Sequence, residues 1–442
     1  MNSFTESPAA SAPHPIVVRL KRLRKWLHPG MGVKRWGLMV FGGVGLTSLG
    51  VAIARDLDLA WPVIEFLYKV TNQLVPHTVS GGVIAFIGLI LVAVGVRQTV
   101  RSIAAVLAPD DKPLVDVIYE KRQLERGYRV VVIGGGTGLS VLLRGIKKHT
   151  SNITAVVNVA DDGGSSGRLR ERGYAPPGDI RNCLVALADV EPLMEELFQY
   201  RFSGMGSDLD GHSFGNLFIA ALTDVTGNFE KAVEATSKVL SIRGRVLPAT
   251  LEDVKLGARL ENGQVIIGQT KVNQATSPIE RAFLEPACPH PLPEVLEAIR
   301  DAEVIVIGPG SLYSSIMPNL LVPQIAAAVQ ASKALKIYVC NVMTQPRETL
   351  GYTASDHVRA IMRHAGEGLI DFVLVNTKKP STPVLERYRQ AGADYVEPDI
   401  ENITALGMTP ITGDFINETL VVRHDSQKLA DAIFLLVEQS RR

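Results

Sequence analysis

The sequence predicts an α/β protein whose Rossmann-like, doubly wound and mostly parallel sheet follows a transmembrane hairpin of two helices. From residue 128 to residue 442, short runs rich in valine and isoleucine alternate with amphipathic stretches, which is typical of βαβ units. Glycine-rich turns follow several of these runs. Two long uncharged segments before residue 100 predict the hairpin.

The overall composition narrows the function classes. A chain of 442 residues is long for one domain, so we expect at least two units. The formal net charge of only +1 gives no global field that would attract nucleic acid, and no nucleic-acid partner is expected. Three scattered cysteines without C-x-x-C spacing fit reduced, buried thiols rather than disulfides or a zinc site.

The N-terminal region divides into an arm and two apolar segments. Residues 1–35 form a basic, partly disordered arm, and residues 36–54 and 79–96 are the two segments. Each approaches the ~20 apolar residues that a spanning helix needs. Glycines such as Gly42, Gly43, Gly45 and Gly82 are tolerated in membrane helices, where they allow close packing. We expect Trp36, Trp61 and Tyr68 at the membrane interfaces.

Two other interpretations of these segments fit less well. A cleaved signal peptide would have an unusually long basic region and would not be followed by a second apolar segment. A pair of buried soluble helices would show a charged face, which both segments lack.

The distribution of basic residues predicts the orientation of the hairpin. Basic residues crowd before the first segment, and Arg97 and Arg101 follow the second. The positive-inside rule therefore places both ends in the cytoplasm, with the lipid bilayer as a partner of the hairpin. Residues 97–127 are expected to be a linker that contains a short charged helix ending at Gly127.

The soluble domain, residues 128–442, divides into strands, helices and one insertion. The expected strands are 129–133, 153–159, 303–307, 336–340 and 372–375. The expected helices are 138–148, 180–189, 193–202, 214–222, 230–240, 322–329, 357–364 and 427–439. The Asn262-Gly263 turn predicts a hairpin within a β-rich insertion at about 245–292. Ligands of doubly wound sheets bind at the carboxyl ends of the strands, where the strand order reverses.

The turn after the first strand has the sequence Gly134-Gly-Gly-Thr-Gly138. Its backbone amides and the following helix N-terminus can bind a phosphate. The spacing matches neither G-x-G-x-x-G, because Leu139 occupies the last glycine position, nor a P-loop. A tight turn without a ligand explains these residues equally well. The predicted contacts are Gly135, Gly136, Thr137 and Gly138.

The turn after the second strand contains two neighbouring carboxylates, Asp161 and Asp162. Acids at this place bind a ribose hydroxyl or a Mg²⁺ ion, so Mg²⁺ is the one cofactor suggested and these two residues are its predicted ligands. A solvated turn is the alternative. Small and basic residues nearby suit phosphate oxygens. The predicted ligand contacts of this turn are Asn158, Asp161, Asp162, Ser165, Ser166 and Arg168.

The remaining strand-end loops supply further candidates. Asp179 fits a helix N-cap at least as well as a ligand contact, and Ser213 also fits a cap. A lone histidine such as His212 is more often structural than catalytic, and no serine–acid arrangement predicts a hydrolytic triad. If chemistry occurs, its candidates are Asp161, Asp162 and His212. The remaining predicted contacts are Asp179, Arg181, Asn182, His212, Asn216, Gly308, Gly310, Ser311, Asn341 and Asn376.

Taken in order, these segments resemble one known family. They are VIGGGTGLSVLL (132–143), ADDGGSSGRL (160–169), PPGDIRNCLVALA (176–188), HSFGN (212–216), GRVLPAT (244–250), GPGSLY (308–313) and NVMTQP (341–346). The chain resembles the gluconeogenesis-factor family, the YvcK-like branch of the proteins related to 2-phospho-L-lactate transferase (CofD-like). The resemblance covers residues 128–442.

The resemblance implies a Rossmann-like fold and a site for a nucleotide sugar of the UDP-N-acetylglucosamine type. It also implies a role in carbon flux, cell-envelope synthesis and cell shape, as a binding and regulatory protein rather than an enzyme. The transferase relatives move a phospholactyl group from a guanylate-linked donor with Mg²⁺, and their metal-holding acids would fall on Asp161 or Asp162. Dimerisation is common among Rossmann-like proteins, so a homodimer is one expectation.

Two departures from the family pattern leave the ligand open. Arg347 stands where the family usually has glycine, and Gln269-Thr270 replaces the usual Glu-Ser. The first hypothesis is a membrane-bound regulator that senses a nucleotide sugar. The second is a Mg²⁺-dependent transferase, and the third, a nicotinamide-dependent oxidoreductase, is disfavoured by the glycine spacing and the double aspartate.

Overall fold

The computed structural model describes residues 33–55, 62, 65–66, 76–107, 114–189, 192–204, 206, 208–418 and 421–441. The chain forms two compact units, Met1–Lys121 and Arg122–Arg442. The predicted arm up to residue 32, together with Trp61 and Tyr68, lies outside the described residues.

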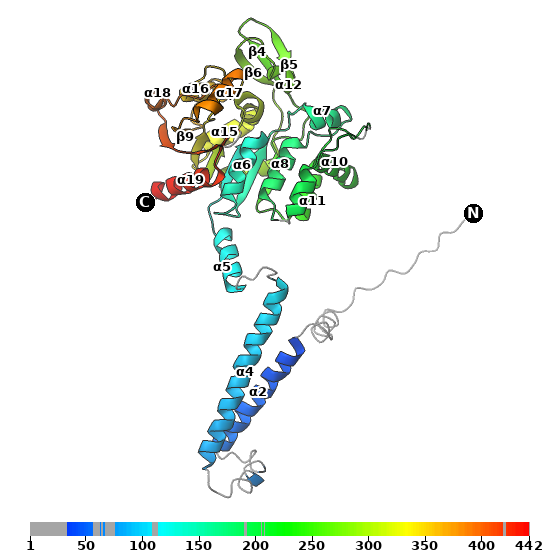
Figure 1. Ribbon diagram of the computed structural model, residues 1–442, viewed down its shortest axis with the longest axis vertical. Coiled ribbons are helices and arrows are strands. Elements are labelled where there is room, and N and C mark those ends of the chain that lie inside the picture. Colours follow the sequence, from blue (N-terminus) through cyan, green and yellow to red (C-terminus); the bar gives the residue numbers. More distant parts are fainter. Residues whose placement is uncertain are drawn as a thin grey trace, which may run out of the picture. The chain divides into compact units, whose positions relative to one another are not determined.

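The first unit contains a pair of packed helices, α2 (Val33–Ala54) and α4 (His77–Leu107) (Figure 1). Each contains a segment long and apolar enough to cross a membrane, Arg35–Ala54 and Thr78–Ser102. Helix α4 continues beyond the predicted end of the second apolar segment, to Leu107.

Glycines set the contact between α2 and α4. A Cβ on Gly50 would lie 2.3 Å from the backbone nitrogen of Ala85, and one on Gly88 would lie 2.5 Å from that of Thr47. Gly43 and Gly81 are equally close to the opposite helix. Three glycines singled out in the sequence, Gly42, Gly45 and Gly82, have no atom of another element within 4 Å, so of the four only Gly43 packs at this interface.

The second unit is built on a parallel sheet with the strand order β10-β9-β8-β7-β1-β2-β3. Its strands are β1 (Val130–Gly134), β2 (Ile153–Val157), β3 (Arg245–Pro248), β7 (Val304–Ile307), β8 (Leu335–Val339), β9 (Phe372–Asn376) and β10 (Thr409–Gly413). Strands β1, β2 and β7 are buried along their whole length, as expected for a sheet covered on both faces. The strand order reverses between β1 and β7, which confirms the doubly wound fold.

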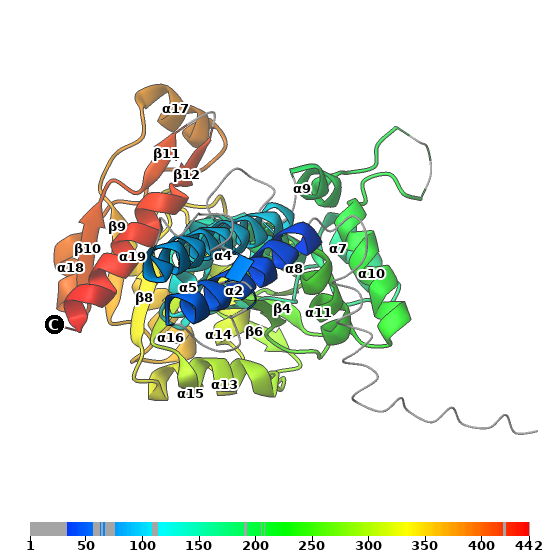
Figure 2. The same cartoon turned by 90° about the horizontal axis from the view of Figure 1, so that it is seen from below.

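Helices cover both faces of this sheet. From β1 the strand order runs to β2, and from β7 it runs to β8 in the opposite direction. Because parallel crossovers are right-handed, the helix between β1 and β2 and the helix between β7 and β8 lie on opposite faces. Helices α6 and α8 lie side by side (Figure 1), as do α13 and α15 (Figure 2). The helices of this unit are α5 (Leu114–Glu125, which begins in the first unit), α6 (Gly136–Ile146), α7 (Gly164–Glu171), α8 (Gly178–Leu187), α9 (Pro192–Gln199), α10 (Phe214–Thr226), α11 (Phe229–Val239), α12 (Gln269–Val272), α13 (Pro293–Asp301), the π-helix η2 (Leu312–Ile316), α14 (Met317–Leu320), α15 (Pro323–Ala331), α16 (Ala354–Ala365), α17 (Thr382–Gln390), α18 (Ile400–Ala405) and α19 (Ser426–Ser440).

Two smaller sheets complete the unit. Strands β4 (Lys255–Leu260), β5 (Val265–Ile267) and β6 (Ile279–Glu285) form an antiparallel sheet in the order β5-β4-β6. Strands β11 (Ile416–Glu418) and β12 (Val422–His424) form a two-stranded sheet before α19.

The structure corrects two local predictions. The insertion was expected to begin near residue 245, but β3 (Arg245–Pro248) pairs in parallel with β2 as the edge strand of the main sheet. The segment after Gly163 was expected to be a turn, but Gly164–Glu171 is helix α7. Glycine and serine have modest helix propensity, and here tertiary packing outweighs it.

Candidate functional site

Two glycine-rich turns cross at the point where the strand order reverses. One follows β1 and the other follows β7, and a Cβ on Gly138 would lie only 2.7 Å from the carbonyl oxygen of Pro309. The backbones can approach this closely because Gly138 has no side chain. Gly136, with φ +67°, turns the chain into α6, so the amides of the first turn of α6 point toward the carboxyl end of the sheet.

A cavity of about 470 Å³ opens beside the two turns. Its lining includes the predicted residues Gly135, Gly136, Thr137, Gly138, Gly310, Ser311 and Asn341, together with residues of α17 and β12. Arg423 is the only lysine or arginine among its described lining residues. The sequence motifs did not point to Arg423, because only the packing of the β11–β12 hairpin places it beside turns nearly three hundred residues earlier.

Asparagine side chains fix the positions of these turns. Asn341 binds both sides of Gly310, accepting from its amide at 3.3 Å and donating to its carbonyl at 2.7 Å. Asn158 donates to the carbonyl of Ser314 at 3.2 Å, and its own oxygen accepts from Ala160 at 2.7 Å. Both Asn158 and Asn341 therefore act on the backbone around the site.

Asn376 has a different role from the one predicted. Its amide donates to the carbonyl of Lys378 at 2.7 Å and accepts from the amide of Phe415 at 3.1 Å. It does not line the cavity among the residues described there, so it joins β9 to the segment that follows β10.

Asp161 and Asp179 lie at adjoining strand-end turns. The N-cap of α8 is Pro177, so Asp179 lies within the first turn and not at the cap position. Its carboxylate accepts a hydrogen bond from the amide of Gly136. Burial, and secondly the negative charge of Asp161, raise the pKa of Asp179 to about 7. Two neighbouring carboxylates of this kind are stabilised by a proton or a cation.

The side chain of Asp162 binds the backbone and side chain of Thr270 in the insertion. Its Oδ1 accepts hydrogen bonds from the amide of Thr270 at 2.8 Å and from its hydroxyl at 2.6 Å. If a Mg²⁺ ion is bound, its carboxylate ligands would therefore be Asp161 and Asp179 rather than the predicted pair Asp161 and Asp162. Mg²⁺ commonly takes one or two carboxylates and completes its shell with water and substrate phosphates. In the described part of the chain, no group of three histidine, cysteine or acidic residues could hold a metal.

The remaining predicted residues form a buried polar network around α7, α8 and α10. The hydroxyl of Ser165 lies 2.9 Å from Nδ1 of His212 and accepts from the amide of Asn216 at 3.0 Å. Arg181 donates to the hydroxyl of Ser213 and, at 2.8 Å, to the amide oxygen of Asn182. The network lies away from the residues that line the cavity. Its other members are Ser166, which accepts from the amide of Gly178 at 3.1 Å, and Arg168, which donates to the carbonyl of Asp210 at 2.7 Å.

Glu348 is a buried acid that the sequence reasoning missed. It is 5% exposed, and its carboxylate accepts from the amide of Tyr313 at 3.3 Å at the start of η2. Burial raises its pKa above the usual range of a glutamate. Glu348 thus stabilises the turn after β7. Its position within the segment TQPRET, residues 344–349, was the sequence feature that could have pointed to it.

Comparison with known proteins identifies the family. Residues 130–416 match the family model described as 2-phospho-L-lactate transferase CofD. The gluconeogenesis factor of Bacillus subtilis is 51% identical over 313 residues, which cover 70% of this chain and 98% of that protein. This chain belongs to the gluconeogenesis-factor family. A crystal structure of a UPF0052 family protein from Bacillus halodurans is 50% identical, has a TM-score of 0.68 and covers 70% of this chain and 99% of that one.

The relatives differ in whether they share the N-terminal helices. A family member from Nostoc sp. is 51% identical over 424 residues, which cover 94% of this chain and 92% of its own length. An alignment of that extent must include most of α2 and α4. The Bacillus members match 70% of this chain over nearly their whole length, which is about the length of the second unit.

Proposed function

We propose that this gluconeogenesis-factor family member binds a nucleotide sugar of the UDP-N-acetylglucosamine type and regulates carbon flux, envelope synthesis and cell shape. The observation that supports this is the cavity of about 470 Å³ at the reversal of the strand order. Cavities that hold small ligands measure ~300–1,000 Å³. The diphosphate would lie on the amides at the start of α6, with Arg423 neutralising its charge.

The hairpin gives this regulator a place in the cell. We propose that α2 and α4 span the membrane, with both ends and the second unit in the cytoplasm, in line with the basic residues that flank the segments. A cysteine introduced at residue 60, between the two apolar segments of the sequence, should react with an impermeant thiol reagent in intact cells, whereas one introduced at Lys333 should react only after lysis. The opposite pattern would reverse the orientation.

Titration calorimetry of the full chain in detergent tests the ligand. UDP-N-acetylglucosamine, GDP and NAD⁺ are compared with and without Mg²⁺. We expect the UDP sugar to bind tightly without turnover, and Arg423→Ala to weaken it at least tenfold. The control Lys333→Ala changes an exposed lysine at the amino end of β8, whereas the cavity lies at the carboxyl ends of the strands. This change should leave the affinity unchanged. Equal affinities for all three nucleotides would contradict the proposal.

A Mg²⁺-dependent transferase is the second candidate, favoured by the neighbouring carboxylates of Asp161 and Asp179 and by the CofD family match. These two residues would hold the ion, which would stabilise negative charge developing on a transferred phosphoryl group. A strict Mg²⁺ requirement together with preference for the guanine nucleotide would support this candidate over the regulator.

A further inference from the structure

The side chains of three arginines and one histidine meet at one loop, residues 210 to 213. Arg168 donates to the carbonyl of Asp210 at 2.7 Å, and Arg201 donates to the carbonyl of Gly211 at 2.7 Å. His212 follows, with its ring against the hydroxyl of Ser165. Arg181 then reaches the hydroxyl of Ser213. Three guanidinium groups and one imidazole are therefore held within a few ångströms of a single stretch of backbone.

The negative charges of Asp179 and Asp161 act on Arg181, but neither carboxylate forms an ion pair with it. Within the described ranges, Arg168, Arg181 and Arg201 make no salt bridge. The charges also affect one another: burial and then the neighbouring arginines, including Arg168 and Arg201, lower the pKa of His212. Burial and then Arg201 lower the pKa of Arg181 to about 10. Groups that repel one another in this way are stabilised by an anion between them.

Two buried polar atoms at the same place have no partner. Arg181 is 6% exposed and its Nε has none, and Asn216 is 2% exposed and its Oδ1 has none. Buried polar groups are almost always hydrogen-bonded, so the network is incomplete as it stands. An oxyanion or its water shell would supply the missing partner of the guanidinium.

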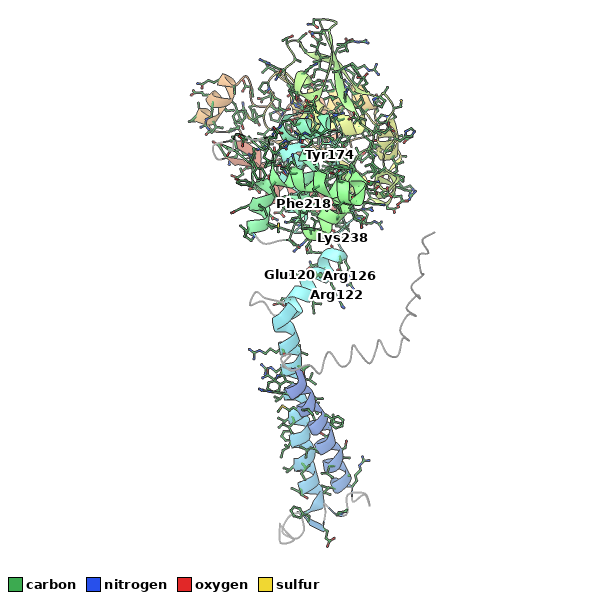
Figure 3. All side chains as sticks on the ribbon, turned by 90° about the vertical axis from the view of Figure 1, so that its right-hand side faces the viewer. Glu120, Arg122, Arg126, Tyr174, Phe218 and Lys238 are labelled. Carbon is green, nitrogen blue, oxygen red and sulfur yellow. The ribbon has the colours of Figure 1, made fainter. Side chains whose placement is uncertain are left out.

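Secondary structure holds these groups in place. Tyr174, between α7 and α8, donates to Asp224 of α10 at 2.7 Å, and Phe218 of the same helix packs against Phe198 (Figure 3). Helices α7, α8 and α10 are thereby fixed to one another beside the loop. In the basic cluster of Arg168, Arg181, Arg201 and His212, Arg168 lies on α7 and Arg181 on α8, whereas Arg201 and His212 belong to the segment between α9 and α10.

Among the described lining residues of the cavity beside the glycine-rich turns, none belongs to the basic cluster. Asp179 contacts Gly136 at the first turn of α6, and Arg181 follows Asp179 by two residues in α8. We propose that the basic cluster is a second anion site, which binds the phosphate or carboxylate group of a small acid. This goes beyond the proposed function, because the charged diphosphate of a nucleotide sugar is already placed on the glycine-rich turns.

Inorganic phosphate is the probe that tests this site. Its binding to the full chain in detergent is measured by titration, with the double variant Arg168→Gln/Arg201→Gln, the variant Arg423→Ala, and Arg300→Gln as the matched control. Arg300 is an exposed residue of α13 and lies 3.5 Å from Asp301, so its change should have no effect. We expect the double variant to lose at least tenfold in phosphate affinity while Arg423→Ala keeps it, and saturating UDP-N-acetylglucosamine not to displace the phosphate.

Two results would overturn the second anion site: unchanged phosphate binding in the double variant, or loss of binding in Arg423→Ala, which would place the phosphate in the cavity. If the double variant does not fold, the wild-type chain still decides the question, since phosphate in the basic cluster should shift the ring NMR signals of His212 and phosphate elsewhere should not. Failure of the UDP sugar to bind would count against the proposed function only, because the phosphate titration does not depend on it.

Discussion

Asp162 and Thr270 join the turn after β2 to the start of α12 in the insertion. One carboxylate oxygen accepts both the amide and the hydroxyl of Thr270, at 2.8 and 2.6 Å. The neighbouring Asp161 instead faces Gly178 and the carboxylate of Asp179. Two adjacent acids therefore have separate tasks, one in holding the insertion and one at the candidate site.

Alanine substitutions at these two acids should separate stability from ligand binding. Asp162→Ala removes two hydrogen bonds at an exposed position and should lower the free energy of unfolding by about 1 kcal/mol, with nucleotide affinity kept. Asp161→Ala should weaken Mg²⁺-dependent nucleotide binding with little loss of stability. Denaturant unfolding and calorimetry of residues 122–442, which fold alone in the Bacillus relative, measure both. Identical behaviour of the two variants would contradict this division.

Asp179 should make stability depend on pH. Its pKa is about 7 in the folded chain and 3.8 in the reference state, so the folded state binds more protons than the unfolded state between these values. Its contribution is therefore fully present below pH 4 and is lost as the pH rises through 7. Asp179→Asn should be nearly neutral at pH 3 but stabilising at pH 8, by at most about 4 kcal/mol. Equal changes in unfolding free energy at both pH values would show that the carboxyl is not perturbed.

The crossing of the two glycine-rich turns should not tolerate a methyl group. Gly138→Ala would bring a Cβ within 2.7 Å of the Pro309 carbonyl, and should cost about 1–3 kcal/mol of stability and weaken nucleotide binding. Gly134→Ala is the matched control, since its Cβ would meet nothing closer than 3.5 Å. Thermal unfolding and the UDP-sugar titration measure the difference, and equal effects of the two variants would exclude close backbone packing as the cause.

Arg347 has a left-handed backbone conformation, with φ +69°. Such a conformation costs a non-glycine residue ~1–2 kcal/mol of stability. Glycine removes this strain, but it also increases the entropy of the unfolded chain, which offsets part of the gain. Arg347→Gly should therefore stabilise residues 122–442 by up to about 1 kcal/mol. Arg347→Ala removes the same side chain but keeps the strain, so it should give no such gain in denaturant unfolding.

The helix pair should depend on its packing glycines and not on the others. Gly50→Leu would drive a side chain into the backbone of Ala85, whereas nothing lies within 4 Å of Gly42. We expect Gly50→Leu to lower the thermal stability of the detergent-solubilised chain and Gly42→Leu to leave it unchanged. Tryptophan fluorescence would report the melting, because Trp26, Trp36 and Trp61 all belong to the first unit. Equal melting of the two variants would show that the interface lies elsewhere.

The sequence predicted the fold well where the signal is local. Runs such as Val130–Ile133 and Val304–Ile307 are too apolar to be anything but buried strands of a two-sided sheet. The general rule for doubly wound sheets predicted a site at the reversal of strand order, but only the strand pairing shows that this reversal lies between β1 and β7. The family resemblance was confirmed on the same segments.

Contacts between distant segments could not be predicted in this way. From the sequence, Asp161 and Asp162 are equally good candidates for binding a ligand. Only the structure shows that Thr270 donates to Asp162 and leaves Asp161 at the candidate site. Arg423 belongs to a strand of three residues whose partner strand is equally short, so no periodicity marks it. Arg201 stood outside every motif, and an isolated bridge between Arg201 and Ser213, within the segment between α9 and α10, brings it beside His212.

The spacing of the packing glycines in α2 and α4 restricts how this helix pair can move. Gly43 and Gly50, like Gly81 and Gly88, are seven residues apart, a rise of about 10 Å along a helix. A shift of one helix along the other by less than this distance would press side chains against backbone. The pair should therefore move as a single rod, which can tilt or rotate as a whole but cannot act as a piston.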